Sequence, residues 1–349
     1  MRIVVVGASG NVGTSLLSAL VADPDVGSVL GLARRLPTLR VPKVEWAAAD
    51  VSRDELVPHF RGADAVVHLA WAIQPSRDRD LMWRINVHGS DRVFRAVAEA
   101  GVPALVYASS VGAYSPGPKD RLVDESWPTN GVRTSFYGRH KAEVERRLDR
   151  FEHEHPEVRT VRLRPGLIFK REAASGIRRL FVGPLFPSPL ARKGLVGLVP
   201  DIPGLRFQAV HSLDVGEAYH LAVKRDASGP FNIAAEPVLD PSELARIFGA
   251  RTVPVPRGVA RAAAAVSWRL RLQPTPEGWV DMALGVPLLD TTRARTELGW
   301  SPSRRADDAL LELFDGLRER AGVETPPLSP RAGGRLRARE LTTGIGRKP

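Results

Sequence analysis

Apolar residues in the first half of the chain follow two alternating patterns. Short apolar or β-branched runs occupy Arg2–Val6, Ser28–Leu32, Val44–Ala47, Ala65–Leu69, Ala104–Ala108 and Val158–Leu163. Helical patterns lie between several of them, over Asn11–Ala22, Asp80–Ala100 and Thr134–Phe151. Strands that are apolar on both faces and alternate with helices are typical of a parallel sheet covered on both sides. The pattern therefore predicts a doubly wound α/β fold.

The pattern changes after Arg164. A stretch rich in Gly and Pro shows no steady period, and one further strand follows at Gly229–Ala234. Helical patterns return at Pro241–Phe248, Val259–Leu272, Thr291–Leu298 and Ala306–Arg320. We interpret 1–170 as the sheet domain, to which a later strand near 205–235 returns, and 171–325 mainly as a smaller C-terminal α/β substrate lobe. The basic segment 326–349, rich in Pro, Gly and Arg, is predicted to be disordered.

Three glycines at a spacing of three join the first strand to the first helix. The run is Gly7-Ala8-Ser9-Gly10-Asn11-Val12-Gly13. Gly7 allows a tight turn, Gly10 lets the backbone approach a pyrophosphate, and Gly13 permits close packing of helix on strand. The free N–H groups of a helix N-terminus favour negative charge. This context predicts a Rossmann-type dinucleotide site, in which Ser9, Asn11 and Val12 also contribute.

Arg34 and Arg35 follow the second strand, where an NAD-selective site typically has an acidic residue. No acidic residue lies between Gly27 and Val44. An arginine at this position accommodates a 2′-phosphate. The sequence therefore favours NADP, although NAD remains possible and both arginines could be simple solvated side chains.

Tyr137 and Lys141 are four residues apart in a predicted helix, so they share one face. A lysine ammonium near a phenol lowers the pKa of the phenol. A tyrosine of this kind can exchange a proton with a substrate hydroxyl at neutral pH. Ser109 and Ser110 end the strand Ala104–Ala108, at the edge where doubly wound sheets bind ligands. One of these two hydroxyls is expected to face the site.

Charge and composition narrow the class of protein. The net charge is +11, but the segment after residue 325 carries six basic residues against one acid, and no nucleic-acid recognition motif accompanies the charge. The absence of cysteine excludes disulfides, thiolate metal sites and a cysteine nucleophile. No apolar stretch approaches the roughly 18 residues of a membrane span, and no signal-peptide pattern is present. We expect a cytoplasmic protein with no metal and no nucleic-acid or membrane partner.

Taken in order, these motifs resemble the extended short-chain dehydrogenases/reductases of the NAD-dependent epimerase/dehydratase family, over roughly residues 1–320. Further segments carry the resemblance: Asp50-Val51, Val66–Ala70, Asn86–Ser90, Arg164-Pro165-Gly166, His211–Val215 and Gly299–Pro302. The resemblance implies a catalytic set of Ser110, Tyr137, Lys141 and Asn86, the last completing a proton relay. It implies that Asp50 and Val51 contact adenine. It also implies that four residues lie beside the nicotinamide ribose and ring of a bound cofactor: Leu69, Ala70, Trp71 and Pro165.

Two departures from the family pattern bear on the substrate. Nucleotide-sugar epimerases of the family typically carry an asparagine after the arginine that follows the strand Val158–Leu163, where this chain reads Arg164-Pro165-Gly166-Leu167. They also carry an Arg-x-Gly-Asp-like element where it has Val255–Val259. The lobe offers the aromatic side chains Trp268, Trp279, Phe181 and Phe186 instead, although each could simply be core. These departures favour an NADP-dependent oxidoreductase of a small alcohol or ketone. An NAD(P)-dependent epimerase or dehydratase of a nucleotide sugar is the alternative, and a cofactor-binding protein without turnover is a third.

The resemblance also implies a homodimer. Family members commonly pair through the helices that correspond to Asp80–Ala100 and Thr134–Phe151. Leu81, Ile85, Val93 and Phe94 could supply an apolar seam, or they could pack on the sheet.

Overall fold

The computed structural model describes residues 1–74, 76–183, 196–332 and 345. Its centre is a seven-stranded sheet of order β11-β7-β5-β4-β1-β2-β3, in which every neighbouring pair is parallel. The strands are β1 (Arg2–Val6), β2 (Ser28–Ala33), β3 (Val44–Ala48), β4 (Ala65–His68), β5 (Ala104–Ala108), β7 (Arg159–Pro165) and β11 (Gly229–Ile233). The direction of strand succession reverses between β1 and β4, which is where doubly wound sheets bind ligands. The predicted fold class is confirmed.

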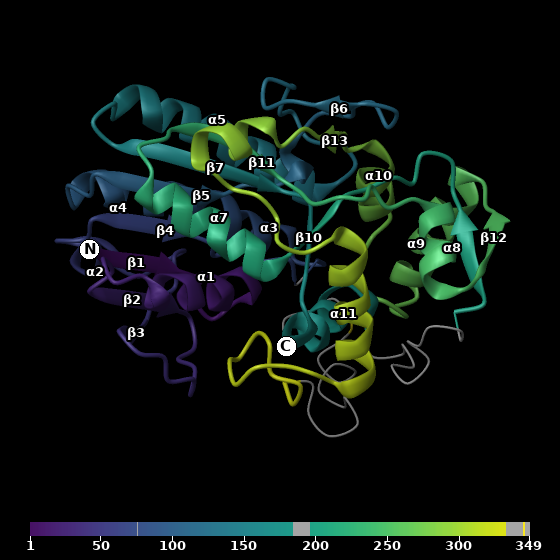
Figure 1. The fold of residues 1–349 in the computed structure, drawn as a ribbon, viewed down its shortest axis with the longest axis horizontal. Coiled ribbons are helices and arrows are strands. Elements are labelled where there is room, and N and C mark those ends of the chain that lie inside the picture. Colours follow the sequence, from purple (N-terminus) through teal and green to yellow (C-terminus); the bar gives the residue numbers. More distant parts are fainter. Residues whose placement is uncertain (75, 184–195, 333–344, 346–349) are drawn as a thin grey trace.

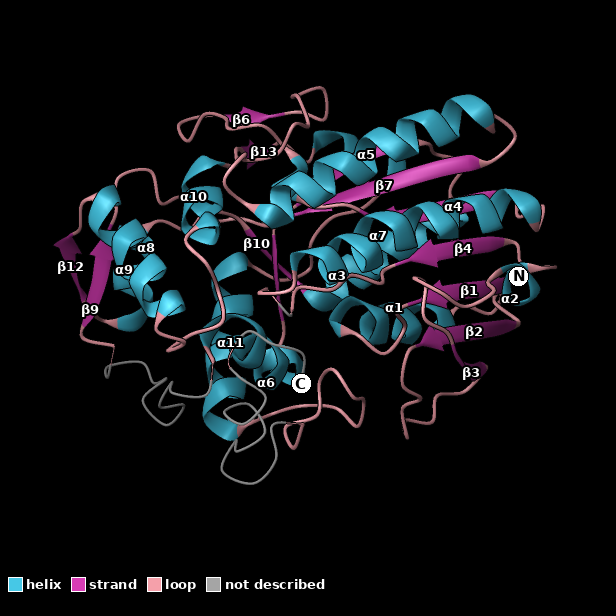
Figure 2. Cartoon of the chain, turned by 180° about the vertical axis from the view of Figure 1, so that it is seen from behind, coloured by secondary structure: helices cyan, strands magenta, loops and turns pink. Residues whose placement is uncertain are grey.

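Two helix layers cover the sheet (Figures 1 and 2). Ile3 and Val5 of β1 point into one core with α1 (Asn11–Ala22) and α7 (Ser212–Lys224). Val4 and Val6 point into the other core, with α4 (Gly89–Glu99) and α5 (Phe136–Glu154). Successive side chains of a strand point to opposite faces. A strand between two cores is therefore apolar throughout, as the sequence of β1 is.

The predicted helix over Asp80–Ala100 is one continuous path in three parts. α3 (Arg79–Trp83) leads into a π-helical turn, η1 (Arg84–His88), and then into α4. Ile85, Val93 and Phe94, three of the four residues considered for a dimer seam, are buried in the chain's own core. Of the two possibilities that the sequence left open for these three residues, packing inside one chain is therefore the one observed.

Several elements were not predicted from the sequence. α7 contains Gly216, which weakens its helical pattern, but a Cβ there would lie 2.7 Å from the carbonyl carbon of Ser15 on α1. Short parallel strands were also not predicted, because runs of two to four residues are too short to show a period of hydrophobic positions. They pair β6 (Leu122–Val123) with β13 (Leu288–Leu289), β8 (Leu167–Phe169) with β10 (Ala209–His211), and β9 (Leu198–Asp201) with β12 (Arg251–Pro254).

The smaller lobe lies at one end of the molecule (Figure 1). It includes α8 (Pro241–Phe248), α9 (Arg257–Arg269) and α10 (Gly278–Gly285), while α11 (Ala306–Glu319) packs back on β10. The remaining helical segments are α2 (Val57–Phe60), η2 (Val111–Ala113), η3 (Arg171–Ala173), α6 (Ala174–Ile177), η4 (Arg178–Val182) and η6 (Ala294–Leu298). Within the described residues, no helix is both long and apolar enough to cross a membrane.

The start of the C-terminal segment is ordered, contrary to the expected disorder from residue 326. Leu328 is buried, and the carbonyl oxygen of Pro327 accepts a hydrogen bond from Arg179 at 2.6 Å. An apolar side chain within a polar segment can anchor it locally, which composition averaged over the whole segment does not reveal. Residues 333–344 and 346–349 lie outside the described residues, as does Phe186.

Candidate active site

The glycine turn has the geometry that its spacing predicts. Gly7 directly follows β1 with a φ of +90°, and a Cβ there would lie 2.7 Å from the backbone nitrogen of Ala70. A Cβ on Gly13 would lie 2.5 Å from the carbonyl oxygen of Ala8. Gly10 is the N-cap of α1 and supplies no side chain to its first N–H groups. The turn therefore leaves the start of α1 able to bind a pyrophosphate.

Lys170 supports this turn from beneath and was not identified from the sequence. Its Nζ donates to the carbonyl oxygen of Asn11 (3.0 Å), to Oγ1 of Thr14 (2.7 Å) and to Oγ of Ser15 (3.0 Å). Burial lowers the pKa of Lys170 to about 8. Lys170 follows β8, which is too short to be predicted, so no sequence pattern indicated that it reaches α1.

The adenosine end of the predicted site lies after β2 and β3. Arg34 and Arg35 are both exposed, and Asp50 is half-buried. Burial raises the pKa of Asp50, but hydrogen bonds from Ser52 and the nearby charges of Arg34 and Arg53 outweigh it and hold the pKa below its ordinary value. Arg34 is thus close enough to Asp50 to act on it electrostatically. An arginine and a carboxylate therefore lie near each other in the region where the ribose and adenine of the cofactor are expected to bind.

Asn86 holds the loop that follows β4. Its Oδ1 accepts from the backbone nitrogen of Ala72 at 2.7 Å, and its Nδ2 donates to the carbonyl oxygen of Ala72 at 2.8 Å. The side chain is fully buried, and Nδ2 lies 3.5 Å from Nδ1 of His140. Asn86 sits in the π-helical turn η1, a feature frequent at functional sites. Its two bonds fix Leu69, Ala70 and Trp71, which precede Ala72 at the sheet edge.

The two serines after β5 have different partners. Ser109 donates to Oε1 of Glu145 at 2.5 Å and is therefore directed into the protein. Ser110 Oγ accepts from the backbone nitrogen of Gly112 at 3.0 Å, and its hydrogen bond to Tyr137 lowers the pKa of that tyrosine. The sequence left the choice between them open, and the structure brings Ser110 to Tyr137.

Tyr137 and Lys141 lie on one face of α5, but their electrostatics differ from the expectation. Burial raises the pKa of Tyr137 to about 12, against the lowering effect of Ser110. Burial also lowers the pKa of Lys141, because its ammonium is only partly compensated by Glu145. Lys141 Nζ donates to the carbonyl oxygen of Ala108 (2.5 Å) and lies 5.9 Å from the centre of the Tyr137 ring. In this structure, burial outweighs the predicted lowering of the Tyr137 pKa by Lys141.

Aromatic rings surround the tyrosine. The ring of Trp279 lies 5.0 Å from that of Tyr137, and the ring of Trp71 lies 5.8 Å from it. Phe181 stands edge-on to Trp279 at 4.9 Å, and Lys141 Nζ lies 3.6 Å from the centre of the Trp71 ring. Of the aromatic residues predicted for the lobe, Trp279 and Phe181 belong to this group, whereas Trp268 stacks on Arg77. The sequence did not single out Trp71 as an aromatic neighbour of Tyr137.

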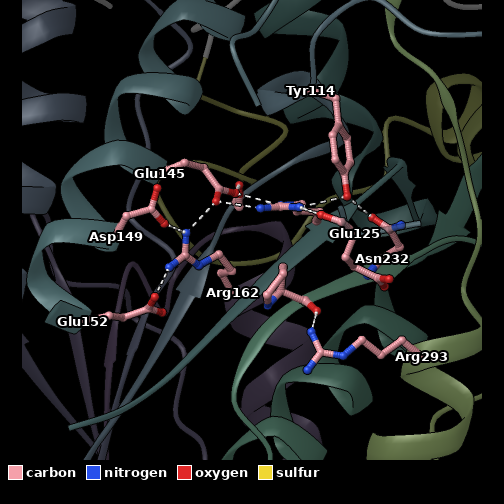
Figure 3. Close-up of polar contacts among 11 residues, drawn as sticks. Tyr114, Glu125, Glu145, Asp149, Glu152, Arg162, Asn232 and Arg293 are labelled. Atoms are coloured by element: carbon pink, nitrogen blue, oxygen red, sulfur yellow. Dashed lines mark hydrogen bonds and ion pairs between the residues drawn. The ribbon is translucent and has the colours of Figure 1, made fainter. Parts of the chain in front are cut away.

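A buried ion cluster lies behind the serines (Figure 3). Glu145 binds Arg164 through both carboxylate oxygens at 2.9 Å, and Arg162 Nη1 lies 2.9 Å from Oε2 of Glu145. Arg164 also donates to the Tyr114 hydroxyl, which donates to Asn232 on β11. Arg162 pairs further with Asp149 and Glu152. The cluster therefore connects Ser109 to α5, β7 and β11.

Gly166 has no room for a side chain. A Cβ at this position would lie 2.6 Å from the carbonyl oxygen of Gln208. The backbone nitrogen of Leu167 donates to the same oxygen at 2.9 Å, as part of the contact between β8 and β10. The segment Arg164–Leu167, which lacks the expected asparagine, is therefore closely packed at Gly166. Arg257, in the region of the second missing element, donates to the carbonyl oxygen of Pro203.

Two of the segments that carry the family resemblance, His211–Val215 and Gly299–Pro302, contact each other rather than the candidate site. Trp300 Nε1 donates to the carbonyl oxygen of Asp214 at 2.8 Å, and Ser303 Oγ donates to the Asp214 carboxylate. His211 Nδ1 accepts from the backbone nitrogen of Leu213 and caps α7. These motifs join α7 to the start of α11.

Comparison with known proteins assigns this arrangement to a family. The model of the NAD dependent epimerase/dehydratase family matches residues 3–234. The chain belongs to this family. It is 27% identical over 326 residues to an uncharacterised protein of Mycobacterium tuberculosis, an alignment that covers 93% of this chain and 31% of that protein. The chain thus spans about a third of the length of that relative.

Two solved structures illustrate the shared fold. UDP-glucose 4-epimerase of Thermus thermophilus, in complex with NAD, superposes with a TM-score of 0.66 at 22% identity. The alignment covers 91% of this chain and 99% of the epimerase. DesIV of Streptomyces venezuelae, a dTDP-glucose 4,6-dehydratase with NAD bound, superposes with a TM-score of 0.67 at 21% identity. That alignment covers 91% of this chain and 97% of DesIV. The shared fold agrees with the family match and with the parallel sheet described above.

Proposed function

We propose that this enzyme epimerises a sugar carbon of a nucleotide sugar, by oxidising its hydroxyl and reducing the ketone again in the same turnover. The observation that carries the proposal is the meeting of Ser110, Tyr137 and Lys141 beside the glycine turn. Family membership and the nucleotide-sugar enzymes of the same fold support this choice over the small-alcohol reductase favoured by the sequence. Dehydration needs a further acid or base, and Trp71 and Trp279, the described rings against Tyr137, supply none.

Each residue of the set has a separate task in this mechanism. Tyr137 accepts the proton of the substrate hydroxyl as the carbonyl forms, and it returns the proton when the alcohol is restored. Ser110 donates to the same substrate oxygen and holds it against the tyrosine. Asn86 holds the loop that carries Trp71. A bound nicotinamide dinucleotide supplies the hydride acceptor, and its oxidised ring carries a positive charge.

The residues present fit such a dinucleotide. The turn at Gly7 and Gly13 has no space for side chains, and the start of α1 is free of a side-chain cap. Protonated Lys141 has three N–H donors. Two of them point to the Ala108 carbonyl oxygen and the Tyr107 hydroxyl, and Nζ also lies 3.6 Å from the centre of the Trp71 ring, so a ribose hydroxyl would replace one of these contacts. Arg34 and Arg35 are exposed after β2, so we retain a preference for NADP over NAD as part of the proposal.

A specific observation favours net oxidation or reduction as the second candidate. The segment Arg164–Leu167 lacks the asparagine expected to contact a nucleotide diphosphate. The rings of Trp71, Trp279 and Phe181 offer an apolar surface near Tyr137. An alcohol or ketone without a nucleotide would fit these features.

One experiment separates the two candidates. The purified enzyme is incubated with UDP-glucose and separately with dTDP-glucose, with cofactor either at the enzyme concentration or in large excess. Sugar epimers detected by NMR without net change in nicotinamide absorbance support epimerisation. The second assay uses a panel of alcohols and ketones. If the absorbance of added cofactor changes stoichiometrically with one of them and no epimer forms, the epimerisation proposal is replaced by net oxidation or reduction.

A further inference from the structure

The solvent-facing side of α9 is apolar, the reverse of an ordinary surface helix. None of the residues of α9 is buried. Val259, Val266 and the C-cap residue Leu270 have exposed fractions of 57%, 53% and 64%. With the exposed Ala263 they are spaced by four, three and four residues, which places them on one face. A helix on a protein surface normally turns such a stripe toward the core and its polar side toward water.

The other side of α9 is occupied by the protein. α9 packs against α10, and the half-buried Trp268 stacks on Arg77, whose guanidinium carbon lies 4.3 Å from the ring centre. The helix is therefore held in place by its inner face. Rotation about its axis to bury the outer stripe would break these contacts.

The charged residues in the segment that carries this stripe are all arginines. Between Glu243 and Glu277 the sequence contains no acidic residue and six arginines. Arg261 pairs with Asp281, and Arg246 pairs with Glu243. Arg269 and Arg271, on either side of Leu270, are exposed and form no ion pair with the described residues. The end of α9 thus reads Arg269-Leu270-Arg271-Leu272, with Leu272 exposed as well.

We propose that the outer face of α9, with Leu270 to Leu272, docks on the surface of an anionic lipid membrane. This surface is defined by Val259, Ala263, Val266 and Leu270 with the flanking Arg269 and Arg271. Helices that lie in a membrane interface combine an apolar face with flanking basic residues. The acyl region takes up the valines and leucines, while lipid phosphates pair with the arginines. No spanning segment is required, so the absence of one from the sequence does not bear on this mode of binding.

Other occupants fit the charges and side chains less well. A second copy meeting this face across a two-fold axis would bring together two helices that carry arginines and no acidic residue. Like charges brought together in this way oppose association. A nucleic acid would satisfy the arginines but would leave Val259, Val266 and Leu270 without apolar contact. A membrane interface satisfies both kinds of residue.

Co-sedimentation with lipid vesicles tests the proposal in the full-length protein. Vesicles of equal parts phosphatidylcholine and phosphatidylglycerol should bind the protein, and pure phosphatidylcholine should bind it weakly. Each arginine near an anionic surface contributes about 1 kcal/mol, so Arg269→Gln with Arg271→Gln should lower the partition coefficient roughly 30-fold. Val259→Ser, Val266→Ser and Leu270→Ser together should lower it by about tenfold or more, because less apolar area is buried.

Matched variants elsewhere control for charge and surface polarity. Arg40→Gln with Arg295→Gln removes two exposed charges away from α9, and Leu213→Ser changes an exposed leucine of α7. Neither should alter the partition coefficient. Thermal melts and cofactor titrations should match the wild type for every variant. If the α9 variants bind anionic vesicles as tightly as the wild type, or if they only convert a dimer to a monomer in light scattering, the proposal is overturned.

The docking proposal does not depend on the proposed reaction. Among the described residues, the loop after β4 contacts the end of α9 through Arg77, which donates to the carbonyl oxygen of Trp268. Gln74 and Ser76 of the same loop donate to the carbonyl oxygen of Pro274, which follows α9. Loss of vesicle binding with normal turnover would therefore separate the two. Failure of the epimerisation assay would leave the vesicle result unaffected.

Discussion

Tyr137 is the residue on which the proposed chemistry depends. Its hydroxyl is buried with a pKa of about 12, so it is protonated at neutral pH in the absence of cofactor. Deprotonation therefore needs a further positive charge beside it, because the buried Lys141 has a lowered pKa of its own. A bound oxidised nicotinamide would supply such a charge, so we expect Tyr137 to act as a base only in the complex with the cofactor.

Tyr137→Phe should remove turnover without unfolding the protein. The ring and its contacts with Trp71 and Trp279 remain, while the ionisable hydroxyl is lost. We expect a rate loss of roughly 100- to 10,000-fold with unchanged cofactor affinity, measured by steady-state kinetics and calorimetry. Lys141→Met should lower the rate similarly and also weaken cofactor binding. Retention of more than about a tenth of wild-type turnover by Tyr137→Phe would exclude the assigned relay.

The arginines after β2 should decide the choice of cofactor. Charge-assisted bonds to a 2′-phosphate contribute roughly 1.5–3 kcal/mol, which corresponds to about 10- to 100-fold tighter binding of NADP than of NAD. Arg34→Gln with Arg35→Gln should abolish this difference and leave NAD affinity unchanged. Arg295→Gln, an exposed arginine far along the chain from the cofactor motifs, is the control. Equal affinity of the wild-type protein for both cofactors in calorimetry would refute the preference.

Two buried histidines should make the fold sensitive to acid. Burial lowers the pKa of His68 to about 3 and that of His140 to about 4, from about 6.5 in the unfolded chain. Below pH 6.5 the unfolded state binds more protons, so the free energy of unfolding should fall as the pH decreases toward 4. Urea melts at pH 7 and pH 5 measure the decrease. His140→Gln should reduce it, and an unchanged dependence on pH in this variant would contradict the assignment.

At the scale of elements, α5, β7 and β11 form one unit through the ion cluster in Figure 3. Glu145 lies one helical turn after Lys141 and holds both Arg162 and Arg164 of β7. Burial raises the pKa of Glu145, but its hydrogen bonds and ion pair with Arg164 and its pair with Arg162 lower it to about 2. The carboxylate is therefore charged at every physiological pH.

Glu145→Gln should destabilise the fold strongly. Removing one partner of a buried ion pair typically costs 3–5 kcal/mol, so we expect a decrease of about 3 kcal/mol in the free energy of unfolding. Glu143→Gln on the same helix breaks only the partly exposed pairs with Arg146 and Arg147 and should cost less than about 1 kcal/mol. Urea denaturation compares the two variants. Equal effects would show that the cluster does not hold α5 to β7.

At the scale of the whole molecule, assembly remains a prediction. The residues first considered for a dimer seam are mostly buried, and the outward side chains of α4 and α5 include the exposed Arg95, Arg146 and Arg150. A dimer through these helices would be polar, so it should dissociate as the salt concentration rises. Light scattering at micromolar concentration, at low and high salt, measures this. A monomer under both conditions would refute the dimer.

The sequence alone determined the central sheet. Its strands are apolar on both faces, as in β1, and residues next to each other in the chain decide that pattern. The glycine turn was equally clear, because its spacing, its strand and its helix all lie within residues 2–22. Tyr137 and Lys141 were recognisable because four residues in a helix set their relation. Local information was sufficient for each of these features.

Tertiary structure decided what depends on distant contacts. It selected Ser110 over Ser109, because Glu145 on α5 engages Ser109. It raised the pKa of Tyr137 through burial, which no local spacing reveals. It brought Lys170 under α1 and buried Phe94 in the core rather than in an interface. It also turned the apolar face of α9 outward, since the helical period fixes which residues share a face but not which way that face points.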